Sequence, residues 1–483
     1  MNSYLANLSP CYQNLARQIE QVPDSQSYVK RSAGKLLPEV ARSLEDIVLK
    51  ALPPLIHRSS VTTSISLDKN WYSSTYQYNS EKFKYNTYIE RAFCKLIDAG
   101  YVQVTTKGWL DRNTGNSDNT KYRLTSKFKA WFHTQLADVG FDGKLEDLIV
   151  DPLLLPNPYP LRVQKRKQGD ISSLEPRTEK IPFITTAKSE QICLDIQKLN
   201  KVLDQTWVDL DLTDYQWKEL DKVLAKHKKR DRPRFIRFNE KRIYRVFHDT
   251  DFNTGGRYYG GWWQTIPKEY RKHLIIDGKA TVEVDYSGLH PAILYAKEGL
   301  TLPKDPYTPI LGPQHRDLSK KLFNALINAK KDPEAPPRGV KIRFPDQPLN
   351  WEQIKERIYE IHAPIREHFC KGSGLWLMHE DSVLATGVLH HFANMGVPCL
   401  PVHDSFIVHH GYEEDLRKKM SELFADRYGF TPSLKDKGVI FYRSDIPSRD
   451  TLDVQDILAA LDTRQDRRLE AFRELRRRDN KLS

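Results

Sequence analysis

The stretch VEVDYSGLHP, residues 282–291, ends an apolar run in a single aspartate, Asp285. Residues 400–408, LPVHDSFIV, repeat this arrangement around Asp404. A carboxylate at the end of a hydrophobic strand costs free energy to bury unless a partner compensates its charge. The repeated pattern therefore raises the question of whether the two carboxylates meet at one compensating partner.

Length and charge narrow the function classes. The chain has 483 residues, enough for two or three domains, and a net charge of +12 from 75 Lys and Arg against 63 Asp and Glu. This balance favours a polyanionic partner, nucleic acid before membrane, although an ordinary basic surface has the same composition.

The cysteines and the apolar runs bear on the compartment. None of the five cysteines forms a CxxC pair, which argues against a zinc site and a disulfide framework. There is no signal-peptide core at the N-terminus and no run of eighteen apolar residues. We therefore expect a cytoplasmic protein without a membrane span.

Residues 1–150 are predicted to hold a helical region and then a helix followed by a β-hairpin. Apolar residues share one helical face over 89–97, and Gly100 stops that helix. The alternating YVQVTTKGW (101–109) predicts a strand, with KYRLT (121–125) as its partner. This order resembles a winged helix-turn-helix domain, and any small unit of one helix and two strands would have the same pattern.

The rest of the chain divides by composition. Residues 151–180 are rich in proline and are interpreted as a linker, and 181–239 have helical periodicity. Strand-like and helical segments alternate over 240–445, with a second Pro-rich break at 331–348, and 446–483 predict a charged amphipathic helix.

A basic run precedes the alternating region. KHKKRDRPRFIR (226–237) holds seven Lys or Arg in twelve residues. It predicts contact with a phosphate backbone, and its alternative is a solvated charge run.

A predicted helix, RDLSKKLFNALINA (316–329), carries two cations four residues apart. Arg316 and Lys320 project from one face, where they can grip a triphosphate, Arg by a fork and Lys as a point charge. Asp285 and Asp404 could hold a pair of Mg²⁺ ions, which prefer oxygen ligands. Two such ions stabilise the attacking and leaving oxygens in phosphoryl transfer. Each feature is common by itself, and their combination predicts nucleotide chemistry.

Four segments in chain order resemble the motifs of family A DNA polymerases and their single-subunit RNA polymerase relatives. They are TGGRYYGGWWQTIP, DYSGLHPAILY, RDLSKKLFNALINA and VHDSFIV, within 240–410. The resemblance implies an α+β fold, a right-hand polymerase palm with an antiparallel sheet and helical fingers. The 181–239 region would be thumb-like, and the helical and winged-helix-like region would precede it.

The resemblance implies a role for each matching position. Asp285 and Asp404 would ligate two catalytic Mg²⁺ ions, for which Mn²⁺ can substitute, with help from the backbone carbonyl of Tyr286. Arg316 would contact the outer phosphates of the incoming nucleotide. Lys320 would neutralise charge near the α-phosphate and could protonate the leaving pyrophosphate.

Three further positions would contact the primer and template. Arg257 would touch the nucleic-acid backbone, His403 would position the primer terminus, and Gln264 lies in the same motif as Arg257. The structural alternatives are an ion pair for Arg257 and a core hydrogen bond for His403.

The chain departs from the family pattern at the nucleotide. His290 stands where DNA-making members have a glutamate that excludes a ribose 2′-OH, and Asn324 and Asn328 stand where the fingers helix usually has aromatic residues. Phe323, one position early, could replace a lost ring by packing. Ser405 after Asp404 is closer to the RNA polymerases, while the DYS and QTIP segments favour deoxynucleotides.

The expected function is a template-dependent polymerase acting on a DNA or RNA primer-template with NTP or dNTP, and a DNA polymerase is favoured. The alternatives are an RNA-making primase or RNA polymerase, and a replication-initiation protein that binds DNA without catalysis. A basic RNA-binding scaffold would leave the paired aspartates unexplained. No exonuclease carboxylate set is found before residue 240, so no proofreading is expected.

Overall fold

The computed structural model describes part of the chain, in which the residues form two hydrophobic cores. The described residues are 9–21, 43–44, 47–48, 51–52, 62–65, 88–110, 117–138, 160–166, 178–181, 183–226, 236–238, 240–337, 340, 349–436, 469–470 and 472–473. Helices and antiparallel sheets are mixed, so the α+β expectation is confirmed at this level.

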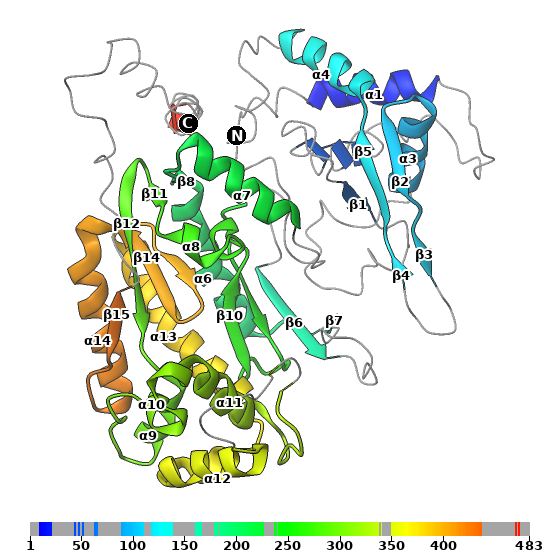
Figure 1. The fold of residues 1–483 in the computed structure, drawn as a ribbon. Coiled ribbons are helices and arrows are strands. Elements are labelled where there is room, and N and C mark those ends of the chain that lie inside the picture. The colour runs from blue at the N-terminus through cyan, green and yellow to red at the C-terminus, as the bar shows by residue number, and fades with distance from the viewer. Residues whose placement is uncertain are drawn as a thin grey trace.

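The N-terminal core combines helices with a three-stranded antiparallel sheet, at the upper right of Figure 1. Its elements are α1 (Ser9–Glu20), β1 (Thr63–Ile65), α3 (Tyr88–Asp98), β2 (Val102–Thr106), β3 (Trp109–Leu110), β4 (Ser117–Asp118), β5 (Thr120–Leu124) and α4 (Ser126–Asp138). The strand order is β1-β5-β2, and β3 pairs with β4 farther along the same hairpin. The predicted helix and hairpin are both confirmed.

Local sequence explains this helix and hairpin. Phe93 and Leu96 of α3 are buried, and the Phe93 ring meets Tyr122 of β5 edge-on at 5.0 Å. Gly100 has φ +75°, the left-handed conformation that glycine adopts without strain, and there the chain leaves α3 for β2. The hydroxyl of Tyr122 donates to the carbonyl of Ile47, which is 2.7 Å away.

A four-stranded sheet begins in the segment interpreted as a linker. Its strands are β6 (Leu161–Arg166), β7 (Thr178–Lys180), β9 (Tyr244–Phe247) and β10 (Gly255–Tyr259), in the order β10-β9-β6-β7. The predicted linker 151–180 therefore contains two strands. Leu161 and Val163 are buried while Arg162 between them is half-buried. This two-residue period is the signal that the proline content obscured.

A six-stranded antiparallel sheet holds both aspartate segments. Its strands are β8 (Val208–Leu210), β11 (Leu274–Ile276), β12 (Lys279–Tyr286), β13 (Leu400–Val402), β14 (Ser405–His409) and β15 (Leu434–Asp436). The order is β13-β14-β12-β11-β8, and β15 also pairs with β12. The strand β8 comes from the region 181–239, so that region adds a strand to this sheet as well as helices.

Helices cover these sheets (Figure 1). The α-helices are α6 (Ala187–Asp204), α7 (Asp214–Lys226), α8 (Lys268–Arg271), α9 (Leu289–Lys297), α10 (Thr308–Leu311), α11 (Arg316–Asn328), α12 (Trp351–Ile361), α13 (Gly374–Asn394) and α14 (Glu413–Tyr428). The 3-10 helices are η5 (Trp262–Gln264), η6 (Pro313–His315), η7 (Ala363–His368) and η8 (His410–Tyr412). The long helix α13 packs against β10, α6, α9 and α14 and so joins both sheets.

The C-terminal segment is described at four residues only. Leu469 and Phe472 are buried, three residues apart, and the Phe472 ring lies 5.4 Å from Trp207. One packed face was expected of this segment, and these residues have it. The rest of 446–483, most of the basic run (227–235) and 341–348 of the second Pro-rich break lie outside the described residues. Within the described part, no helix has the length and apolarity to cross a membrane.

Candidate active site

Strand pairing places Asp285 beside the turn that carries Asp404. Asp285 on β12 lies opposite Ser405 on β14, and the N–H of Tyr286 donates to the carbonyl of Asp404 at 3.3 Å. Opposed Cα atoms in antiparallel strands lie about 4.5–5.5 Å apart, so one residue of offset separates the two aspartates. Both side chains are half-buried, and Oδ1 of Asp285 is buried.

Asp404 sits in a strained two-residue turn. His403 and Asp404 connect β13 to β14, and His403 has φ 61°. A non-glycine residue in this conformation costs about 1–3 kcal/mol, and such residues cluster at functional sites. Desolvation by the surrounding protein, followed by the charge of Arg257, lowers the pKa of His403. The neutral imidazole is therefore favoured beside the aspartates.

A buried ion pair lies next to this turn. Arg257 on β10 donates from Nε to Asp381 Oδ2 at 2.8 Å and also from Nη2, and the Asp381 side chain on α13 is wholly buried. Burial opposes the charged form, but the bonds to Asp381 and the charge of Asp404 outweigh it and raise the pKa of Arg257. Arg257 thus lies within electrostatic reach of Asp404 while its guanidinium is held by another carboxylate.

His290 belongs to the same cluster. Its Nε2 lies 3.2 Å from Asp381 Oδ2 and 3.3 Å from Arg257 Nη2. His290, which was expected to face the sugar of the nucleotide, therefore contacts the buried carboxylate of Asp381. Sequence reasoning missed Asp381, whose one signal was an acidic pair, Glu380 and Asp381, inside an otherwise apolar helix.

The two cations predicted to bind phosphate, Arg316 and Lys320, both lie near the ring of Tyr307. The Arg316 guanidinium lies 5.3 Å from the centroid of Tyr307, and Lys320 Nζ lies 5.9 Å from it. Arg316 also donates from Nε to Asp305 Oδ2 at 2.8 Å. Burial by itself raises the pKa of Asp305, but hydrogen bonds from Arg316, Thr308 and the Tyr307 N–H hold it well below its usual range.

Tyr307 feels the charges of both Arg316 and Asp404. Its pKa is raised first by burial, against the charge of Arg316, and the charge of Asp404 raises it further. The charge of Asp404 therefore acts on the same ring that Arg316 and Lys320 approach.

Two other predicted residues are occupied by structural contacts. The Tyr286 side chain is buried and its hydroxyl donates to the Met420 carbonyl at 2.7 Å, which leaves only its backbone for a nucleotide. Gln264 Nε2 donates to the carbonyls of Pro401 and Tyr258, at 2.8 and 3.1 Å. Gln264 thus ties η5 to β13.

The two asparagines on α11 lie next to each other. Asn328 donates from Nδ2 to the carbonyl of Asn324 at 2.6 Å. A Cβ on Gly374 would lie 1.6 Å from Asn328 Oδ1, so the absent side chain there gives Asn328 its place against α13. Phe323 is fully buried and faces the core.

A second carboxylate on β12 was missed by the sequence reasoning. Glu283 lies two residues before Asp285, and its Oε1 accepts from the Ser405 hydroxyl at 2.7 Å. Arg271 Nε lies 3.2 Å from the other oxygen of Glu283. Alternation places Glu283 and Asp285 on one side of β12, so the aspartate site has a hydrogen-bonded carboxylate beneath it.

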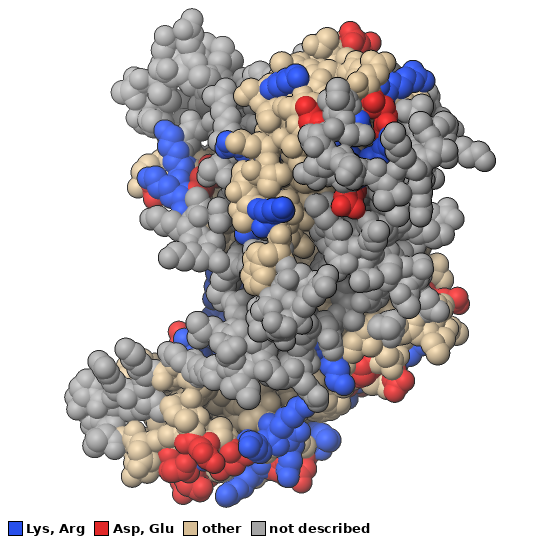
Figure 2. Space-filling view, turned by 90° about the vertical axis from the view of Figure 1, so that its right-hand side faces the viewer, with Lys and Arg blue, Asp and Glu red and all other residues tan. Residues whose placement is uncertain are grey.

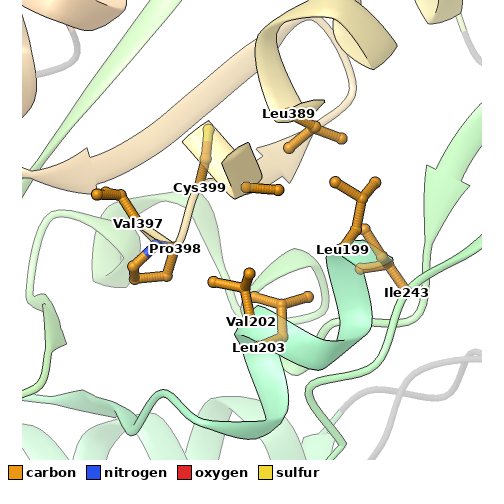
Figure 3. Close-up of a pocket in the computed structure, with 9 residues that line it drawn as sticks. Leu199, Val202, Leu203, Ile243, Leu389, Val397, Pro398 and Cys399 are labelled. Carbon is orange, nitrogen blue, oxygen red and sulfur yellow. The ribbon is translucent and has the colours of Figure 1, made fainter. Parts of the chain in front are cut away.

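Two other features do not extend this site. Among the described residues, Glu298, Glu367 and His368 form the one group of three side chains able to ligate a metal, and His368 Nε2 lies 2.8 Å from Glu298 as in an ordinary ion pair. Figure 3 shows an apolar pocket where α6 meets α13 and the segment 397–399. Its volume of about 10 Å³ scarcely admits one water molecule.

Charge on the face in Figure 2 is mixed. Acidic and basic side chains lie side by side at the lower end of the molecule, so the described residues of this face form no single basic surface there. On this face, a phosphate-binding role would have to rest on individual cations.

Comparison with known proteins adds no assignment. Neither a protein-family model nor a curated protein sequence matches the chain.

Proposed function

We propose that the chain is a template-dependent nucleotidyltransferase that extends a primer 3′-OH, with DNA synthesis favoured. The observation that supports the proposal is the position of Asp285 on β12 beside the turn that carries Asp404. Arg316 and Lys320 lie around the Tyr307 ring, on which the charge of Asp404 acts. Two carboxylates and a backbone carbonyl are the oxygen donors that Mg²⁺ prefers, so the residues present fit the implied ions. When bound, those ions would stabilise charge on the reacting phosphate oxygens.

Four side chains around the aspartates would take part in this scheme. Arg316 and Lys320 would bind the phosphates of the nucleotide and orient them toward the aspartates. Lys320 would give a proton to the leaving pyrophosphate. His403, favoured in its neutral form, would position the primer end, and Arg257 would place the strand by its charge while Asp381 fixes its guanidinium.

Primer extension on a defined template tests the proposal. We expect Asp285→Asn and Asp404→Asn each to lower nucleotide incorporation on the order of 10²–10³-fold or more, because fixed charge at the reacting centre is lost. Asp426→Asn, at an exposed position on α14, is the matched control and should extend at the parental rate. Incorporation by Asp285→Asn or Asp404→Asn at the control rate would remove the aspartates from the reaction.

The proposed contact between Arg316 and the nucleotide phosphates can be tested separately. Arg316→Ala should raise the apparent KM for nucleotide by about tenfold or more, because a charge-assisted contact is lost. Arg366 stacks on Tyr359 at 5.0 Å, much as Arg316 stacks on Tyr307, so Arg366→Ala is the matched control. An unchanged KM in Arg316→Ala would exclude a phosphate contact.

Sugar choice separates DNA synthesis from RNA synthesis. His290, held by Asp381, offers an imidazole where a glutamate would exclude the ribose 2′-OH, and this contact favours the RNA-making alternative. Reactions with only dNTPs or only NTPs decide the question. Exclusive use of NTPs would make the chain a primase or RNA polymerase.

DNA binding without catalysis is the remaining alternative. Phe323 is buried, and Asn324 and Asn328 present no ring for base stacking, which favours a palm that no longer incorporates nucleotides. The hairpin of the N-terminal sheet, with Trp109 half exposed at 53%, would then bind duplex as the wing of a winged helix. This alternative predicts salt-sensitive DNA binding and no incorporation even with Mn²⁺.

A further inference from the structure

Four side chains form a continuous row that ends at His403, in the turn that carries Asp404. The guanidinium carbon of Arg162 on β6 lies 3.4 Å from the centroid of the Tyr244 ring on β9. Tyr244 stacks with Tyr259 on β10 at 6.2 Å and 28°, and Tyr259 meets His403 edge-on at 5.8 Å. We call these residues the Arg162 row. His403 is followed directly by Asp404, so the row leads from β6 to the proposed active site.

Strand register builds the Arg162 row. Tyr244 and Tyr259 lie directly opposite each other in the antiparallel pair of β9 and β10. The parallel strand β6 places Arg162 beside Val246, two residues after Tyr244 and on the same side of β9. Gly260, with φ +115°, leaves room for the row, since a Cβ there would lie 2.9 Å from the Tyr244 ring.

The Arg162 row lies on the outward side of its sheet. Arg162, Tyr244 and Tyr259 are half-buried and His403 is exposed, while Leu161 beside Arg162 is 2% exposed. Adjacent strands lie about 4.8 Å apart, so the row extends about 10 Å from β6 to β10. That length matches about three nucleotides at the 3.4 Å rise of one strand.

The chemistry of the row suits a sugar–phosphate backbone. Arg carries five donors in a planar fork that matches phosphate and stacks on aromatic rings, as Arg162 does on Tyr244. Tyrosine hydroxyls and arginine are among the groups that contact phosphate and sugar in protein–nucleic acid complexes. The net charge of +12 favours the same partner.

We propose that Arg162, Tyr244 and Tyr259 form the surface along which the backbone of a nucleic-acid strand lies as its end reaches Asp404. This inference rests on the proposed function for the reaction at that end. It adds residues of β6 and β9, outside all four polymerase-like motifs, to the strand-binding surface.

Oligonucleotide binding without nucleotide tests the Arg162 row. Fluorescence anisotropy is measured with labelled single-stranded DNA, single-stranded RNA and a DNA primer-template, each over a range of salt. We expect Arg162→Ala to weaken binding about tenfold and to reduce the slope of log affinity against log salt by about 1, through loss of one phosphate contact. The probe with the largest loss identifies the strand type.

Tyrosine variants separate the ring from its hydroxyl. Tyr244→Phe and Tyr259→Phe keep the packing and should weaken binding by a few-fold, through loss of a hydroxyl contact. Tyr244→Ala should weaken it further, with folding checked by circular dichroism. Arg366→Ala, which also removes an arginine stacked on tyrosine, is the matched control and should bind as the parent does.

The outcomes separate this inference from the proposed function. If Arg162→Ala binds every probe with the parental affinity and salt slope, the row is packing only and the inference is overturned, whether or not the parent extends primers. If the row variants lose binding while the parent incorporates no nucleotide, the strand-binding surface stands and the proposed reaction fails.

Discussion

Asp381 is a charged residue inside the core, and its two partners account for that position. Its side chain has no exposed surface and accepts hydrogen bonds from Arg257, with His290 Nε2 at 3.2 Å. An isolated buried carboxylate would be costly, but a bidentate arginine offsets most of the desolvation. The pair fixes both Arg257 and His290, and the charge of Asp404 acts on Arg257.

Removing one partner of this pair should be costly. We expect Asp381→Ala to lower the free energy of unfolding by about 3–5 kcal/mol, because Arg257 is left buried without its carboxylate. Urea denaturation measures the change. The double variant Arg257→Met/Asp381→Leu should recover most of it, since it removes both charges. A loss no larger than that of Asp426→Ala would show that the pair contributes little.

The helix α11 divides its residues between two environments. Leu322, Phe323, Leu326 and Ile327 are fully buried, while Lys320 is exposed and Arg316 partly so. The Phe323 ring packs edge-on against Tyr307 at 5.6 Å and Phe369 at 5.2 Å, and 4.8 Å from His362. The buried face therefore anchors α11 to the core and leaves its cationic face toward solvent.

Truncation of Phe323 tests whether the buried face anchors α11. We expect Phe323→Ala to lower the free energy of unfolding by about 3–5 kcal/mol, and Phe323→Leu to lose less because it fills more of the cavity. Chemical denaturation gives both values. Equal stability of Phe323→Ala and the parent would mean that the aromatic cluster does not anchor α11.

Desolvated histidines make the stability of the whole molecule sensitive to acid. Burial is the first cause of a lowered pKa at six of them, which are His273, His362, His379, His390, His403 and His409. His362 is fully buried, with Nε2 2.8 Å from the Pro306 carbonyl and Nδ1 3.0 Å from the Tyr295 hydroxyl. In the folded protein the neutral form of these imidazole rings is favoured.

Stability should therefore fall as the pH drops below 6.5, the ordinary pKa of histidine. Below that value the unfolded chain binds protons that the folded chain takes up only at lower pH, so the free energy of unfolding decreases. Urea denaturation at pH 7.5, 6.5 and 5.5 measures the trend. His362→Gln, which cannot titrate, should show a shallower dependence. A stability that rises between pH 7.5 and 5.5 would contradict the assignment.

Short-range patterns predicted several elements well. The helical periodicity of 89–97 and the glycine after it correspond to α3, and the helix predicted at 316–329 corresponds to α11. The strand ends at Asp285 and in the turn at Asp404 were recognisable because an apolar run stopped at a charge. These features depend on neighbours along the chain, which the sequence displays directly.

Long-range contacts were not predictable in the same way. The partners Asp381 of Arg257 and Asp305 of Arg316 lie 124 and 11 residues away from them. Arg162 was hidden in a segment that its prolines marked as a linker, and Glu283 looked like any polar residue in a strand. Asp381 met Arg257 when α13 packed against β10. Arg162 and Glu283 gained their neighbours when strands far apart in the sequence paired.

The sequence by itself determined which segments are helices and strands along much of the described chain, and which residues carry charge at their ends. Only the tertiary structure decided that Asp285 lies opposite the residue that follows Asp404. It also decided that Arg162, Tyr244 and Tyr259 form a row that ends at His403. The physical reason is that periodicity reports burial within a segment, whereas a site is set by the register between segments. That register depends on the packing of the whole core.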